Sequence, residues 1–146
     1  MDYARLRDEL MADPLGRGYG SMSPDQAAAS LMTENRTVIE ATQVGALGIM
    51  RELGPAAGAA VLDALEAASA SDSRLRWVMR ELSTVGIDLG HPVTRATIQE
   101  LAAAGVLTPS QLDALLSVAV RTVSRAEELG LGEVRPGDVE TAKGYV

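Results

Sequence analysis

Cysteine and phenylalanine are both absent from this chain of 146 residues, and aromatic residues make up only 3% of it. Without cysteine the chain can form no disulfide bond, no thiolate metal site and no thiol nucleophile. With so few aromatic side chains, the core must consist of Leu, Val, Ile, Met and Ala, and a large aromatic-lined ligand pocket is not expected. These absences favour a fold held together by aliphatic packing.

Long apolar runs are also missing, and so is a basic start followed by an apolar segment. We therefore expect neither a membrane span nor a secretory signal, and no membrane partner. The formal net charge is -7. We expect no direct binding of nucleic acid, because phosphate backbones are bound mainly by clustered Lys and Arg.

The chain is rich instead in signals that begin and end helices. The strongest lie in residues 108–131, where Thr108, Pro109 and Gln111 form a capping box and apolar residues then recur at helical spacing as far as Val123. Ser124 begins a second cap. Similar signals predict further helices at about 2–12, 24–32, 42–53, 55–70, 72–83, 92–104 and after residue 134. Residues 33–41 are predicted to form a connection.

We predict an all-α fold, because no segment shows the alternation typical of a strand. The expected architecture is a single compact bundle of about six to eight short helices with a loose N-terminal arm. No linker is long enough to divide the chain, so one helical domain is expected over residues 1–146. Within it, residues 1–40 form the N-terminal helix and arm, and residues 41–146 form the main helical body.

Few residues suggest chemistry. His91, the only histidine, precedes Pro92 and so either caps a helix or acts as a general base. Gly16, Gly18 and Gly20 either cradle a phosphate or form a flexible loop, and the absence of a lysine favours the loop. The C-terminal carboxylates lack the spacing of a metal site. We therefore predict no catalytic residue, no metal site and no cofactor.

Trp77 is the most informative single residue. If Leu75 and Leu82 face the core, a helix of 3.6 residues per turn places Trp77 close to the opposite side, beside arginines. Exposed Trp with Arg is typical of the centre of a protein interface. The alternative is that the N-terminal arm or another helix covers the ring. Nucleic-acid binding by these arginines, Arg76 included, is disfavoured by the overall charge. The predicted interface residues are Trp77, Arg74, Arg80, Arg17 and Tyr19.

Four segments near the two ends of the chain are distinctive: Asp13-Pro14-Leu15-Gly16-Arg17-Gly18-Tyr19, Asn35-Arg36, Ser124-Arg125-Ala126-Glu127-Glu128-Leu129-Gly130 and Pro136-Gly137-Asp138-Val139. In these segments the chain resembles a group of small proteins, mostly of uncharacterised function, encoded by tailed bacteriophages. Residues 37–120 match only in helical character. The resemblance implies a phage origin and a virion or assembly role in the head-to-tail or tail region. It supplies no catalytic or binding residue.

Together these observations predict a structural or assembly protein without enzymatic activity. Its expected partners are other phage structural proteins and further copies of itself, in the virion and, before assembly, in the host cytoplasm. The alternative is a small acidic helical regulatory module that binds a host protein in the cytoplasm.

Overall fold

The computed structural model describes residues 1–144, and its internal contacts divide the chain into two units. Unit 1 combines residues 1–38 with the segment that begins at residue 121, and unit 2 consists of residues 39–120. The C-terminal segment therefore groups with the N-terminal one, whereas the expected division at residue 40 placed it with the main body. Each unit has its own cluster of buried apolar side chains.

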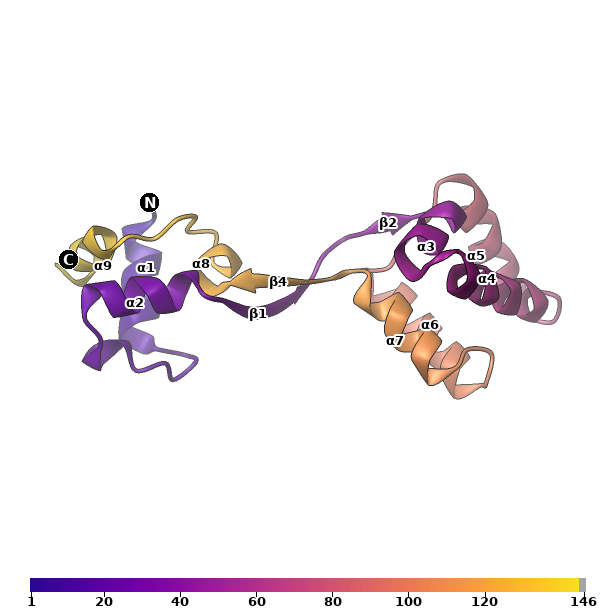
Figure 1. Ribbon diagram of the computed structural model, residues 1–146, viewed down its shortest axis with the longest axis horizontal. Helices are drawn as coiled ribbons and strands as arrows, with labels where there is room; N and C mark the ends of the chain where they lie inside the picture. The colour runs from indigo at the N-terminus through magenta and orange to yellow at the C-terminus, as the bar shows by residue number, and fades with distance from the viewer. Residues whose placement is uncertain (145–146) are drawn as a thin grey trace. The chain divides into compact units, whose positions relative to one another are not determined.

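Unit 1 is a helical unit with one pair of strands, β1 and β4 (Figure 1). Its elements are α1 (Tyr3–Ala12), the 3-10 helix η1 (Tyr19–Ser21), α2 (Pro24–Met32), β1 (Glu34–Ile39), β4 (Val120–Ser124), α8 (Arg125–Glu128) and α9 (Pro136–Gly144). One residue of each strand, Ile39 and Val120, lies beyond the boundary of the unit. Helix α9 packs against α1 and α2. The core of the unit includes Leu6, Leu10, Tyr19, Leu31, Ala126 and Val139.

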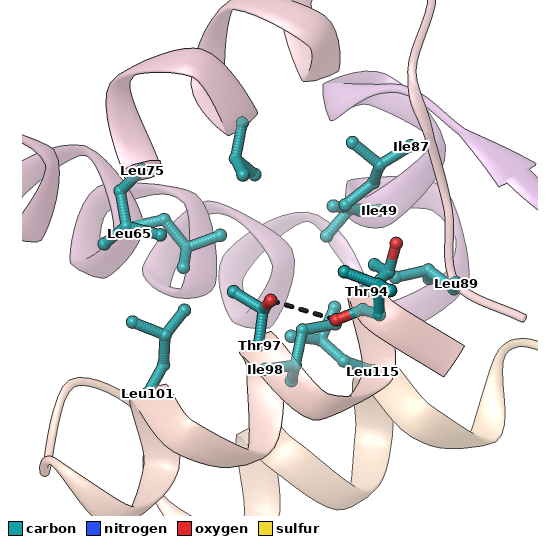
Figure 2. A pocket seen from close by; sticks show the side chains of 12 residues that line it. Ile49, Leu65, Leu75, Ile87, Leu89, Thr94, Thr97, Ile98, Leu101 and Leu115 are labelled. Carbon is teal, nitrogen blue, oxygen red and sulfur yellow. Dashed lines mark hydrogen bonds between the residues drawn. The ribbon is translucent and has the colours of Figure 1, made fainter. Parts of the chain in front are cut away.

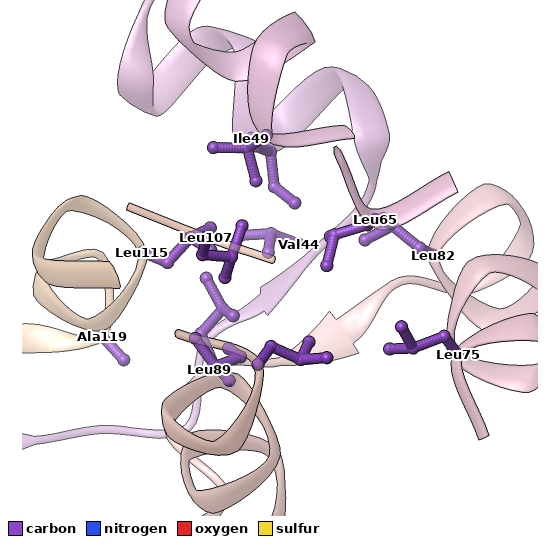
Figure 3. Close-up of a cluster of buried hydrophobic side chains, with 12 residues drawn as sticks. Val44, Ile49, Leu65, Leu75, Leu82, Leu89, Leu107, Leu115 and Ala119 are labelled. Atoms are coloured by element: carbon purple, nitrogen blue, oxygen red, sulfur yellow. The ribbon is translucent and has the colours of Figure 1, made fainter. Parts of the chain in front are cut away.

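Unit 2 contains five helices among its described residues and a short antiparallel ladder. Its elements are β2 (Gln43–Val44), α3 (Ala46–Leu53), α4 (Pro55–Ser69), α5 (Ser73–Thr84), β3 (Ile87–Asp88), α6 (Pro92–Ala103) and α7 (Pro109–Ser117). In the ladder, Gln43 faces Asp88 and Val44 faces Ile87. Helices α3, α4 and α5 pack in sequence, and α6 packs against α7. Their aliphatic side chains form the core shown in Figure 3.

The predicted helix starts are confirmed where a polar side chain caps the backbone. Thr108 and Ser23 each form the complete capping box. In both boxes the Oε1 of the Gln three residues later accepts a hydrogen bond from the backbone N–H of the cap residue. Ser124 accepts a hydrogen bond from the N–H of Glu127 and begins α8. His91 caps α6, since its Nδ1 accepts from the N–H of Val93 at 3.1 Å. The capping interpretation of His91 thus accounts for its place in the sequence.

The expected all-α fold is confirmed in part, since the described chain is predominantly helical but also contains short strands. Within the predicted connection at residues 33–41, residues 34–39 form strand β1, and residues 120–124 form β4 rather than the last turns of a long helix. Both segments contain β-branched residues, which favour extended backbone. Helix α7 therefore ends at Ser117.

The predicted helix at residues 42–53 begins four residues late, at Ala46. The carboxylate of Asp88 accepts hydrogen bonds from the N–H groups of Thr42 (2.7 Å) and Gly90 (2.8 Å), which holds residues 42–44 extended beside β3. These backbone donors lower the pKa of Asp88. The hydroxyl of Thr42 instead donates to the carbonyl oxygen of Glu40 at 3.0 Å, and α3 begins after Gly45 without a side-chain cap.

The expected loose N-terminal arm is ordered. Asp13 ends α1 in the left-handed region, at φ 42°, and its carboxylate accepts hydrogen bonds from the N–H groups of Arg17 and Gly18, both at 2.7 Å. Gly16 and Gly18 have positive φ, which turns these donors inward. The backbone donors hold the pKa of Asp13 below its usual value. The loop thus binds a carboxylate of its own chain in the place where a phosphate was considered.

No helix within the described residues combines the length and the apolar character needed to cross a membrane.

Candidate protein-interaction surface

Helix α5 carries the most prominent exposed aromatic side chain of unit 2. The carboxylate of Asp72 begins the helix by accepting a hydrogen bond from the N–H of Arg74 at 2.9 Å. Leu75 and Leu82 then lie buried on one face, as predicted. Trp77 lies on the opposite face and is 64% exposed. The alternative that another segment of the chain covers this ring is therefore not realised in the described residues.

Two arginines, Arg76 and Arg80, lie beside the indole of Trp77. We call these three residues the Trp77 surface. These three side chains line one shallow hollow of the protein surface. The guanidinium carbon of Arg80 lies 5.0 Å from the centroid of the indole ring, a cation–π geometry produced by their spacing of three residues. Because the guanidinium is stacked on it, the ring has a preferred orientation before any partner binds.

The charges of Arg76 and Arg80 are not neutralised by an acidic side chain. Within residues 1–144, neither guanidinium has a carboxylate partner. A second hollow adjoins the first, since Arg76 and Arg80 also line it together with Glu66, Ser69, Met79 and Ser83. The surface therefore offers one large amphipathic ring and two available positive charges on a chain whose net charge is -7.

Arg74, which was predicted to belong to the same interface, has a different environment. Its guanidinium forms ion pairs with Asp72 at 3.3 Å and with Glu100 of α6 at 3.2 Å. The hydrogen bond from Arg74 lowers the pKa of Asp72, and the same bond raises the pKa of Arg74. Arg74 therefore links α5 to α6, and Arg76, which the predicted interface omitted, takes its place beside Trp77.

The two predicted interface residues of the arm lie in unit 1 and contact that unit. Tyr19 is 0% exposed, so the prediction that its ring meets another chain is wrong. Burial raises the pKa of the Tyr19 phenol. The guanidinium of Arg17 donates hydrogen bonds to the carbonyl oxygen of Ser30 and, at 2.8 Å, to Oδ1 of Asn35. Both residues hold the arm against α2 and the start of β1.

Sequence reasoning missed a network of charges that joins the two ends of the chain in unit 1. Nε and Nη2 of Arg125 donate to the two carboxylate oxygens of Glu9 at 2.9 and 2.7 Å, and Nη1 donates to Glu128 at 2.9 Å. Arg36 binds Glu128 from the other side at 2.8 Å. The two guanidinium groups, Arg36 first, lower the pKa of Glu128 to about 2. The pKa of Arg125 is raised, chiefly by Glu9.

A signal for this network was present in the sequence. Glu9 lies three residues after Leu6 and next to Leu10, so helical spacing places its carboxylate on the buried face of α1. A carboxylate on a buried face requires a cation or several hydrogen-bond donors. The network is structural, because its ion pairs join α1, β1 and α8 within one unit.

Comparison of the chain with protein-family models, with curated proteins and with solved structures finds no match. Within residues 1–144, no group of three His, Cys, Asp or Glu side chains is arranged to hold a metal ion. The site must therefore be judged from its own geometry.

Proposed function

We propose that this chain is a structural or assembly protein of a tailed-phage particle, without enzymatic activity, and that it contacts its partners through the Trp77 surface. The observation that carries the proposal is the exposed indole with Arg80 stacked on it and Arg76 beside it. Trp and Arg are the residues that most often dominate binding energy at interfaces, where one buried Trp is worth at least about 2 kcal/mol.

The charge of the surface indicates the chemistry of the partner. Arg76 and Arg80, which have no carboxylate partner within residues 1–144, favour a protein surface with an apolar pocket bordered by Asp or Glu. The partners we propose are other structural proteins of the particle in the neck or tail region, and further copies of this acidic chain. The phage context comes from the resemblance at the two ends of the chain. The placement of the protein in the virion is part of the proposal.

The test begins with particles assembled by a phage whose own copy of this gene is deleted and supplied in trans. Quantitative mass spectrometry of purified particles should detect the wild-type chain in a fixed ratio to the other structural proteins. The Trp77→Ala variant should be incorporated at least about tenfold less, since a loss of about 2 kcal/mol corresponds to a factor of roughly 30 in affinity. Trp77 contributes little to the core, so the variant should unfold within about 0.5 kcal/mol of the wild type.

The matched control is Leu47→Ala, which removes a similarly exposed apolar side chain of unit 2 outside the Trp77 surface. It should be incorporated normally. Complete absence of the wild-type chain from purified particles would contradict the proposal and favour the regulatory protein that binds a host partner in the cytoplasm. Normal incorporation of Trp77→Ala would instead exclude the Trp77 surface as the site of contact.

A further inference from the structure

Unit 2 contains an apolar cavity, partly open to solvent at α6, that is separate from the Trp77 surface. Its volume is about 140 Å³, and its lining comes from α3 to α7 and β3 (Figure 2). The lining side chains are Ile49, Leu65, Leu75, Val78, Ile87, Leu89, Val93, Thr94, Thr97, Ile98, Leu101 and Leu115. Ten of these twelve are aliphatic. Protein interiors leave few voids larger than one water molecule, so a cavity of this size is a specific feature of the packing.

The lining does not suit water. A buried water molecule needs two to four polar partners, and the polar side chains around the cavity are those of Thr94 and Thr97. The hydroxyl of Thr97 donates to the carbonyl oxygen of Val93 in its own helix at 2.9 Å, so this donor is already used. No charged side chain lines the cavity. An occupant must therefore be apolar, with at most one polar atom directed toward Thr94.

The size of the cavity corresponds to a single ring. Apolar cavities of roughly 150 Å³ in proteins stay dry and bind benzene. The chain has no phenylalanine, and the only tryptophan lies on the surface, so unit 2 has no aromatic side chain of its own in the core. Access is provided at α6, where the lining residue Val93 is 67% exposed and Thr94 is partly exposed.

We infer that this cavity is a binding site for a small apolar molecule with the size of one six-membered ring. The inference goes beyond the proposed assembly role and does not depend on it, since none of the three residues of the Trp77 surface lines the cavity.

The test uses the full chain and benzene as the probe. The isoleucine δ1 methyl groups are labelled with ¹³C, because Ile49, Ile87 and Ile98 line the cavity whereas Ile39 does not. Benzene should shift the signals of the three lining residues along saturable curves with one shared Kd and leave Ile39 unchanged. It should also raise the Tm, and the added free energy of unfolding should follow RT ln(1 + [benzene]/Kd) with the same Kd.

Two variants reduce the cavity from opposite sides, Val78→Phe on α5 and Thr97→Leu on α6. Each should raise the Kd for benzene at least about tenfold, by steric exclusion from a site of one-ring size. The matched control is Val85→Phe, which adds a ring at an exposed position of the same unit that does not line the cavity, and it should keep the wild-type Kd. If either filling variant fails to fold, the other one decides.

Unchanged isoleucine signals at benzene saturation would overturn the inference. Linear shifts that include Ile39, or binding that survives in a folded filling variant, would overturn it equally, because they would show contact with the surface rather than with the cavity.

Discussion

Replacing Arg125 with methionine should destabilise unit 1 by about 3–5 kcal/mol. The side chain of Glu9 is 4% exposed and that of Arg125 is 13% exposed, and two parallel hydrogen bonds of 2.9 and 2.7 Å join them. Methionine fills much of the same volume but leaves the buried carboxylate without a cation. Since a domain is typically stable by about 5–15 kcal/mol, the loss would be a large fraction of the total.

The loss of stability in each variant depends on whether a buried charge is left without a partner. Glu9→Gln should cost only about 1–3 kcal/mol, because the amide oxygen still accepts a hydrogen bond and Arg125 keeps its contact with Glu128. The double variant Glu9→Leu and Arg125→Met should lie within about 1 kcal/mol of the wild type, since it buries no unpaired charge. The two substitutions should therefore be coupled by at least about 2 kcal/mol.

The assay must report on unit 1. Tryptophan fluorescence does not, because the only tryptophan, Trp77, lies in unit 2 and is already largely exposed. Urea unfolding followed by far-UV circular dichroism gives the free energy, and hydrogen exchange of the backbone amides in α1 and α8 assigns it to unit 1. A loss below about 1 kcal/mol in Arg125→Met, or a double variant as unstable as that single one, would refute the reasoning.

Two further predictions concern acid stability and close packing. The pKa of Glu128 is lowered from 4.5 to about 2, so its contribution to stability is present above about pH 4.5 and is lost as the pH falls toward 2. The Tm measured across this window should therefore vary less in Glu128→Gln than in the wild type, and an equal variation in the two proteins would contradict the prediction. Gly58→Ala should cost about 1–3 kcal/mol, because its Cβ would lie 2.5 Å from Cα of Met50 and force α3 and α4 apart. In Gly48→Ala the new Cβ would meet only the side chain of Val44, at 3.4 Å, so this variant should be more stable than the wild type by up to about 1 kcal/mol. Urea midpoints that ranked the two variants in the opposite order would contradict the packing argument.

The sequence predicted those parts of the fold that depend on residues close together in the chain. The capping boxes at Ser23 and Thr108 and the apolar stripe of α5 each involve only a few consecutive turns, and all of them are confirmed. Strands β1 and β4 lie about 80 residues apart in sequence and pair only with each other. No hairpin turn joins β1 to β4, so nothing in the local sequence marks either of them as a strand. The local pattern therefore predicted a connection in place of β1 and the end of a helix in place of β4.

The contrast between local and distant contacts also explains which residues of the candidate surface were predicted correctly. The exposure of Trp77 follows from the geometry of one helix, and the prediction is confirmed. The roles of Arg74 and Tyr19 depend on partners from other elements. Glu100 of α6 attracts the guanidinium of Arg74, and the loop held by the carboxylate of Asp13 brings Tyr19 into the core. Neither contact can be read from the residues immediately around it.

All the segments that carry the resemblance to phage proteins lie in unit 1, where several of their residues bind one another. Arg17 donates to Asn35, and Arg36 pairs with Glu128. Contacts of this kind stabilise unit 1 from within. The Trp77 surface and the cavity both belong to unit 2. The chain enters and leaves that unit through adjacent residues, since the N–H of Glu40 donates to the carbonyl oxygen of Ala119 at 2.9 Å. Substitutions in the Trp77 surface or in the cavity should therefore leave the contacts within unit 1 intact.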